Sequence, residues 1–154
     1  MNLFRKFTEK SLRKLVYTRK LPSEFGGYNI FVTPDAGLRY LKSNFKKIDP
    51  MINNVIKKFI KRGDTIYDIG SNIGLFTISA HGYLNGDCSI LSLEPDYHLA
   101  SIIQNSIYKN KLQNISILCI AISDSDGFAQ FNIADRARAA SYLNNVPGST
   151  QTGG

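Results

Sequence analysis

Long apolar runs are absent from the 154-residue sequence. No stretch reaches the roughly 18 apolar residues needed to cross a bilayer, and the first twenty positions lack a continuous apolar segment of signal-peptide length. The sequence therefore predicts neither a membrane span nor export, and we expect a cytoplasmic protein. With 43% hydrophobic and 20% charged residues, the composition is that of one globular domain rather than of a disordered or fibrous chain.

Cysteine and histidine are scarce, with two residues of each kind. Cys88 and Cys119 lie in apolar runs without a CxxC pairing or a histidine at metal-ligand spacing, so we predict buried free thiols and no metal site. His81 and His98 have no Ser, Cys or Asp partner at a recognisable offset. We expect both histidines on helix surfaces and assign no catalytic residue.

The formal charge of +7 is distributed unevenly. Residues 1–62 contain 15 of the 19 Lys and Arg residues against four carboxylates, a charge of +11, and the rest of the chain carries −4. Such asymmetry is typical of contacts with nucleic acid or an anionic membrane, and it is also common on solvated helices. Nucleic-acid binding is disfavoured because the basic region lacks interleaved surface aromatics.

Residues 2–17 have the pattern of a basic amphipathic helix, with apolar residues on one side and cations mostly on the other. Two interpretations remain open: peripheral contact with an anionic membrane surface, or packing of the apolar stripe on the body of the protein. Residues 21–34 predict a turn and one short strand around residues 28–32. We treat residues 1–48 as a basic N-terminal helical extension.

Helices and strands alternate from Asp49 onward. Asp49 followed by Pro50 is typical of a helix start, and Gly63 is typical of the residue that closes a helix. The elements predicted next are a strand at 65–69, a helix from 75 to about 84, a strand at 88–93, a helix capped by Asp96 and closed by Asn110, and strands at 115–122 and 128–133.

This alternation, with strands that are continuously apolar, is typical of a parallel sheet covered by helices on both faces. Right-handed crossovers predict the order 3-2-1 for the first three strands of this α/β fold. We therefore place the core at residues 49–133. Residues 134–154 are polar and show no further periodic element, so we treat them as a tail.

A glycine-containing loop joins the first predicted strand of the sheet to its helix. Asp68, Gly70 and Gly74 fall in or beside this loop, where a Cβ at either glycine would block the turn or the approach of a ligand. Glu94 ends the second strand, where a carboxylate can accept hydrogen bonds from both ribose hydroxyls of an adenosine. Together these residues predict a site for an adenosine-containing cofactor.

The loop sequence favours one adenosine cofactor over another. A dinucleotide site requires Gly-x-Gly-x-x-Gly, so that a helix N-terminus can hold a pyrophosphate, but here Ser71 and Asn72 follow Gly70. Asp68 would repel a phosphate, yet it can hold the ammonium group of a methionine moiety. We predict S-adenosylmethionine, with a nicotinamide-dependent oxidoreductase and a loop that only shapes tight turns as weaker alternatives.

Four blocks of this sequence follow one another in a distinctive order: Gly63 to Thr77, Leu93-Glu94-Pro95, the asparagines Asn105 and Asn110, and Ala121 to Gly127. Together they resemble the FkbM family of methyltransferases. The resemblance covers about residues 50–133, and four blocks in order are far more specific than one glycine motif. Ser71 stands where alanine is more usual in the family.

The resemblance implies a Rossmann-like, three-layer αβα class I methyltransferase fold that binds S-adenosylmethionine. It also implies methylation of a hydroxyl on a sugar or another small-molecule or glycan acceptor. The residues it assigns to the cofactor are Asp68, Gly70, Ser71, Asn72 and Gly74 at the methionine end, Glu94 at the ribose with Pro95 beside it, and Asp96 and Ala121 at the adenine.

The resemblance ends before the chain does. Members of the family continue with a fourth strand that carries a lysine-isoleucine-aspartate-valine-glutamate-glycine-like motif, and residues 134–154 contain nothing similar. We therefore expect an incomplete fold in which the strand at 65–69 is an exposed edge that favours self-association. The alternative function is a non-catalytic adenosine-binding remnant or interaction module, attached to a membrane or partner by its basic N-terminal helix.

Overall fold

The computed structural model describes residues 15–41, 49–134, 138 and 141–143. Most of the helix predicted at residues 2–17 lies outside this part of the chain. Its last three residues are not helical, because Leu15 and Val16 have no regular structure and Tyr17 begins a strand.

A parallel sheet of three strands forms the centre of the fold. Its order is β3 (Thr65–Ile69), β4 (Ser89–Leu93) and β5 (Ile115–Leu118), which confirms the predicted order. The register pairs Thr65 with Ser89, and Ile90 with Ile115. Strand β3 is an edge of this sheet, as predicted, whereas β5 ends four residues earlier than expected.

Among the described residues, three α-helices accompany the sheet, namely α2 (Pro50–Phe59), α3 (Leu75–Tyr83) and α4 (Tyr97–Asn110). Two of them begin at the predicted caps. The carboxylate of Asp49 accepts a hydrogen bond from the amide of Ile52 at 3.2 Å, and that of Asp96 accepts one from the amide of His98 at 2.9 Å.

The predicted helix ends are less accurate than the starts. Helix α2 stops at Phe59 because Ile60 is already extended, so Gly63 does not close it. The left-handed Gly63 instead lies in the turn before β3, where its amide bonds to the carbonyl of Asp87 at 2.8 Å. At the end of α4, Lys111 rather than Asn110 takes the left-handed closing conformation.

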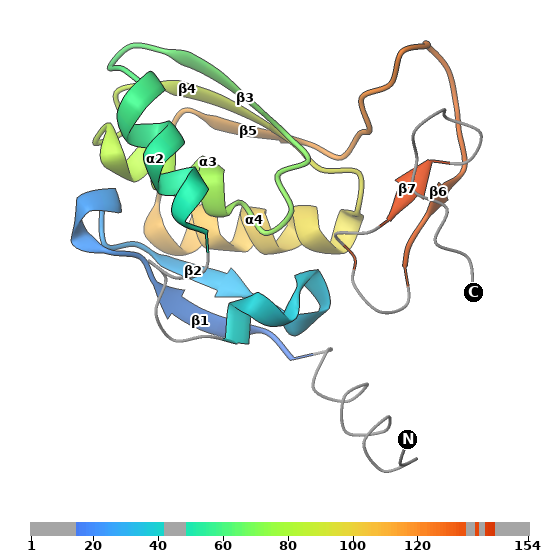
Figure 1. Ribbon diagram of the computed structural model, residues 1–154, viewed down its shortest axis with the longest axis horizontal. Coiled ribbons are helices and arrows are strands. Elements are labelled where there is room, and N and C mark those ends of the chain that lie inside the picture. The colour runs from blue at the N-terminus through green and yellow to red at the C-terminus, as the bar shows by residue number, and fades with distance from the viewer. Residues whose placement is uncertain (1–14, 42–48, 135–137, 139–140, 144–154) are drawn as a thin grey trace.

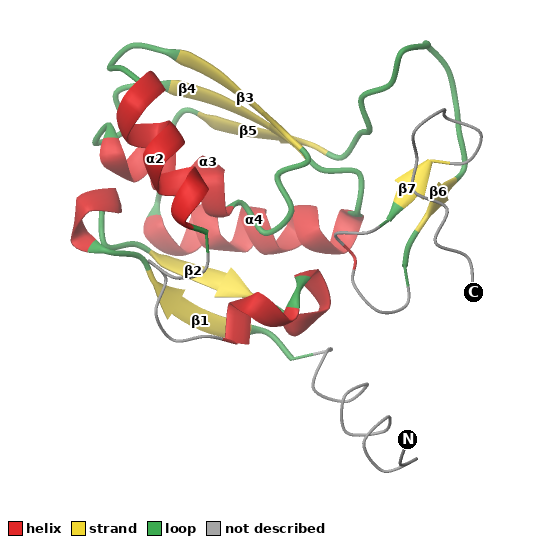
Figure 2. Ribbon diagram, viewed as in Figure 1, coloured by secondary structure: helices red, strands yellow, loops and turns green. Residues whose placement is uncertain are grey.

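The helices lie on one face of the sheet (Figure 1). Figure 2 shows the resulting layers: the parallel sheet, the helices beneath it, and a small antiparallel hairpin on the outer side of α4. The α/β class is thus confirmed. The second helical layer of the expected αβα arrangement is not among the described residues, and the other face of the sheet exposes Tyr67 by 64%, Ile69 by 63% and Leu118 by 43%.

The hairpin consists of β1 (Tyr17–Lys20) and β2 (Asn29–Val32), which pair antiparallel. Strand β2 confirms the short strand predicted around residues 28–32, whereas β1 was not predicted and its first residue, Tyr17, was placed at the end of the helix at 2–17. Short 3-10 turns surround the hairpin at Ser23–Phe25, Pro34–Ala36 and Leu38–Leu41. In its described part, the expected helical extension is therefore a hairpin with turns.

Side chains of α4 bond to the outer edge of β2. The amide of Asn29 donates to Oδ1 of Asn110 at 3.0 Å, and Nδ2 of Asn110 donates to the carbonyl of Asn29 at 2.6 Å. The amide of Phe31 donates to the hydroxyl of Ser106 at 2.9 Å. The hairpin is thereby fixed to the helix by polar as well as apolar contacts.

One hydrophobic core joins the hairpin, the helices and the sheet. Its most deeply buried apolar side chains are Phe25, Ile30, Val32, Tyr40, Ile56, Ile73, Ile78, Leu99 and Ile103. Cys88 is buried as predicted, but Cys119 is exposed because β5 ends before it. The prediction of a surface histidine is wrong for His81, which is 5% exposed with Nε2 at 3.1 Å from the carbonyl oxygen of Gln113.

Beyond β5, two short strands pair antiparallel. They are β6 (Phe131–Asn132), within the strand predicted at 128–133, and β7 (Tyr142–Leu143), which was not predicted. Among the residues that the structure describes, no helix is long and apolar enough to cross a bilayer.

Candidate functional site

The loop between β3 and α3 has a left-handed backbone at three positions, with φ of 77° at Gly70, 56° at Asn72 and 76° at Gly74. Asparagine is one of the few side chains that tolerates this region, and glycine does so freely. The two glycines differ in their surroundings. A Cβ on Gly70 would project into open space, whereas one on Gly74 would lie 2.9 Å from Cγ2 of Ile103 in α4.

Four of the five amides of loop 70–74 donate to groups of the protein itself. Those of Gly70 and Ser71 both donate to the carbonyl of Leu93, at 2.9 and 3.1 Å. The amide of Asn72 donates to Oε2 of Glu94 at 2.7 Å, and that of Gly74 donates to the carbonyl of Ser71 at 2.8 Å. A phosphate cradle needs such amides to point toward the ligand, and here they are turned inward.

Glu94 connects the loop to the start of α4. Its Oε2 accepts the amide of Asn72, and its Oε1 accepts the amide of Asp96 at 3.0 Å. A carboxylate has about four acceptor sites, so each oxygen keeps capacity for one more donor. Burial raises the pKa of Glu94, the two amides lower it, and the negative charges of Asp96 and Asp68 raise it further.

Asp68 faces a small polar network behind the loop. Its Oδ2 accepts a hydrogen bond from the hydroxyl of Thr77 at 2.5 Å, and its carbonyl accepts one from the hydroxyl of Ser71 at 2.8 Å. The hydroxyl of Ser92 donates to that of Ser71 at 2.7 Å. Burial raises the pKa of Asp68, partly offset by these hydroxyl donors. Sequence reasoning missed Thr77 and Ser92, because a polar residue within an apolar helix or strand has no spacing signature.

Asp96 is the most buried of the three carboxylates at the site, at 1% exposed. Besides capping α4, its carboxylate binds Nη1 of Arg138 at 2.6 and 2.8 Å. The Nε of the same arginine donates to Asp35 at 2.6 Å. Arg138 lies 42 residues from Asp96, in what the sequence presents as a polar tail. No local pattern could have revealed this contact.

Pro95 and Ala121, the other predicted cofactor residues, line a pocket of about 950 Å³ beyond the ends of β4 and β5. Its apolar wall includes Ile120, Ile122 and Phe128. The pocket begins next to Glu94 in the chain, at the edge of the sheet where parallel α/β folds bind ligands.

The predicted site residues therefore form two adjoining groups. Hydrogen bonds join the loop to the ends of β3 and β4 through Asp68, Gly70, Ser71, Asn72, Gly74, Glu94 and Asp96, and the pocket adds Pro95 and Ala121. In the described part of the chain, Oδ1 of Asn72 is buried without a hydrogen-bond partner. Such an atom is suited to accept a donor from a ligand.

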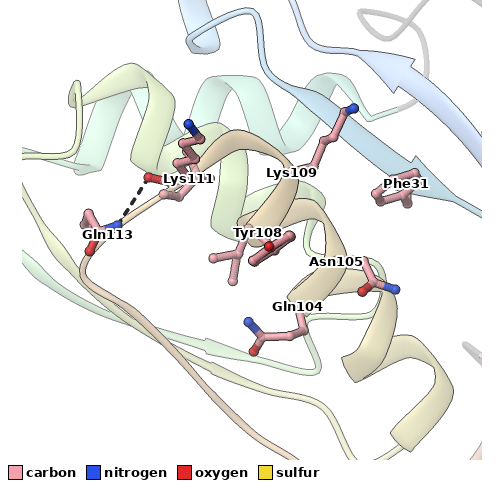
Figure 3. A pocket seen from close by; sticks show the side chains of 9 residues that line it. Phe31, Gln104, Asn105, Tyr108, Lys109, Lys111 and Gln113 are labelled. Atoms are coloured by element: carbon pink, nitrogen blue, oxygen red, sulfur yellow. Dashed lines mark hydrogen bonds between the residues drawn. The ribbon is translucent and has the colours of Figure 1, made fainter.

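A second pocket, of about 770 Å³, lies along the C-terminal half of α4 (Figure 3). Residues that line it include Phe31, Asn105, Tyr108 and Lys109, and none of the predicted cofactor residues is among them. It shares no lining residue with the pocket beside Pro95 and Ala121. We regard it as separate from the candidate site.

Comparisons with known proteins give structural likenesses only. No protein-family model matches the chain, and no curated protein matches it. Similar solved structures include precorrin-6y C5,15-methyltransferase from Geobacter metallireducens, with 18% identity over 45% of this chain and 37% of that one, and a TM-score of 0.40. Another is coclaurine N-methyltransferase bound to N-methylheliamine and SAH, with 16% identity over 82% of this chain and 40% of that one, and a TM-score of 0.48.

A SAM-dependent methyltransferase from Aquifex aeolicus is 15% identical over 64% of this chain and 53% of that one, with a TM-score of 0.46. The chain thus spans between 37% and 53% of the length of these three structures. Because every one of these TM-scores is below 0.5, we base the functional proposal on the site itself.

Proposed function

We propose that this chain binds S-adenosylmethionine and forms the cofactor-binding part of a methyltransferase. The observation that supports this most strongly is the combination of inward-turned loop amides with two carboxylates at the same strand ends, those of Asp68 and Glu94. Negative charge attracts a cationic ligand and repels a pyrophosphate. S-adenosylmethionine carries a sulfonium and an ammonium, whereas NAD carries a pyrophosphate.

The residues of the site suit the parts of this cofactor. Gly70 leaves open the space that a side chain would fill, and the unpartnered Oδ1 of Asn72 is an acceptor that suits the ammonium. The remaining acceptor capacity of Glu94 suits two ribose hydroxyls. The pocket beside Pro95 and Ala121, which has Ile120, Ile122 and Phe128 in its wall, suits adenine. When bound, the cofactor supplies an electrophilic methyl group on its sulfonium sulfur.

We further propose that the enzyme belongs to the FkbM-like methyltransferases and that its acceptor is a hydroxyl of a sugar or of another small molecule or glycan. The four sequence blocks that resemble this family support the proposal. Three of them supply loop 70–74, Glu94 and Ala121, which converge at one edge of the sheet. No side chain of the described part is assigned as a general base.

Isothermal titration of the full chain with S-adenosylhomocysteine, and separately with NADH, tests the cofactor. We expect binding of the first ligand in preference to the second. Glu94→Gln should weaken binding by about 1 to 3 kcal/mol, because a charged acceptor of the ribose is lost. Asp87→Asn is the matched control, since it removes the same charge from an exposed carboxylate just before β4, at the opposite end of that strand. A folded protein that prefers NADH, or that binds neither ligand, would refute the proposal.

Methyl transfer needs a second test, because binding alone also fits the alternative of a non-catalytic adenosine-binding remnant. Labelled S-adenosylmethionine is incubated with the chain and a panel of sugar, glycan and small-molecule hydroxyl acceptors. Label in an acceptor supports the enzyme, whereas binding without transfer to any acceptor favours the remnant.

A further inference from the structure

The buried end of β4 concentrates negative charge. Glu94 and Asp96 are two residues apart and are 6% and 1% exposed, and Asp68 lies on the neighbouring strand. Buried carboxylates are costly unless they are paired or hydrogen-bonded. A cation at this place therefore stabilises the ionised form of the carboxylates around it.

Arg138 provides that cation. It binds both oxygens of Asp96 through Nη1, at 2.8 and 2.6 Å, and its own side chain is only 20% exposed. Its Nε binds Asp35, which follows the hairpin, so one guanidinium joins three segments that are distant in the sequence. A planar guanidinium with several fixed donors is suited to this arrangement in a way that an ammonium is not.

Asp96 in turn contacts the carboxylate that we assign to the ribose. Its amide donates to Oε1 of Glu94 at 3.0 Å, one of the two amides that hold this side chain. From this geometry, and resting on the proposed function, we propose that Arg138 is a positioning residue of the cofactor site: by holding and neutralising Asp96, it keeps Glu94 ionised and oriented for the ribose.

The charged and titratable groups around Glu94 give the direction of the effect. The acidic groups are the carboxylates of Asp68 and Asp96 and the thiol of Cys119. Burial raises the pKa of Cys119, and the charges of Glu94 and Asp96 raise it further. Arg138 is the cation bonded to this cluster. The charge of Asp96 already raises the pKa of Glu94, and without Arg138 to compensate it this charge would raise that pKa further. Cofactor binding would then fail at a higher pH as the solution is acidified.

The test compares Arg138→Met and Arg138→Lys with the matched control Arg39→Met. Arg39 also forms an ion pair with an aspartate, Nη1 lying 3.5 Å from Asp49, but at the start of α2. We expect Arg138→Met to weaken S-adenosylhomocysteine binding about tenfold, the equivalent of about 1.4 kcal/mol. The lysine variant should retain part of the affinity, and Arg39→Met should bind like the wild type.

A second measurement does not depend on the ligand. Carboxyl ¹³C NMR of the ligand-free protein follows the titration of Glu94 in each variant, and its midpoint should move to higher pH in Arg138→Met and less in Arg138→Lys. Equal midpoints in all proteins overturn the inference, even if binding is weaker, because Arg138 would then be merely structural. If Arg138→Met does not fold, Arg138→Gln, which also removes the charge, decides by the same criterion. If the wild type fails to bind S-adenosylhomocysteine, the proposed function is wrong, while the NMR midpoints still decide the role of Arg138.

Discussion

Replacing Gly70 and Gly74 one at a time by alanine separates the stability of the loop from its ligand contact. Both residues have nearly the same left-handed φ, 77° and 76°, so each alanine pays a conformational cost of about 1 to 2 kcal/mol. At Gly74 the new methyl would also lie 2.9 Å from Cγ2 of Ile103, and overpacking of this kind costs about a further 1 to 3 kcal/mol. The expected losses of unfolding free energy are thus about 1 to 2 kcal/mol for Gly70→Ala and about 2 to 5 kcal/mol for Gly74→Ala.

Ligand binding should reverse this order. A methyl on Gly70 meets no protein atom within 4 Å and would project into the space assigned to the cofactor, whereas one on Gly74 points toward α4. We expect the loss of affinity for S-adenosylhomocysteine to be greater in Gly70→Ala than in Gly74→Ala, when the affinity of the latter is calculated for its folded fraction. Urea denaturation followed by circular dichroism gives the stabilities, and titration calorimetry gives the affinities. Equal destabilisation of the two variants, or greater affinity loss at Gly74, would refute this account of the loop.

Three further predictions concern the core and the open edge. Burial lowers the pKa of His81 below 6.5, so the stability that its neutral form contributes is complete above that pH and is lost as the pH falls through the lowered value. In urea titrations, the unfolding free energy of His81→Gln should therefore fall less steeply on acidification than that of the wild type. An unchanged pH dependence would contradict this. Gly82→Ala would press a methyl against the carbonyl of Phe25 and should lower the unfolding free energy by about 3 kcal/mol or more in the same assay. A loss below about 1 kcal/mol would be inconsistent with that contact. Lysine at both Tyr67 and Ile69 should reduce self-association through β3 in sedimentation velocity, and an unchanged distribution of species would exclude this edge as the contact.

Local signals account for the parts of the fold that the sequence predicts well. Asp49 and Asp96 cap their helices through bonds to amides two or three residues away, so the residues that define each start are neighbours in the chain. The loop at Gly70 and Gly74 is local in the same sense, and both glycines have the positive φ that the motif requires.

The remaining features depend on contacts between distant residues. Strand β1 forms because Tyr17 pairs with Val32, and its polar and basic residues alone are compatible with a helix. The short β6 and β7 stabilise one another, and the bond from Arg138 to Asp96 spans 42 residues. The end of β5 at Leu118 is also a tertiary effect, since no strand in the described part of the chain pairs with the apolar residues that follow it.

The amide side chain of Asn110 has a consequence for assembly. By donating to the carbonyl of Asn29 and accepting from its amide, it reproduces the bonding of a peptide unit in an adjacent strand, and the hydroxyl of Ser106 does the same for the amide of Phe31. Helix α4 thus serves as a substitute strand that seals the β2 edge of the hairpin against invasion by another polypeptide. Strand addition at this edge is thereby blocked, and within the described residues the outer edges left for it include those of β1 in the hairpin and of β3 in the parallel sheet.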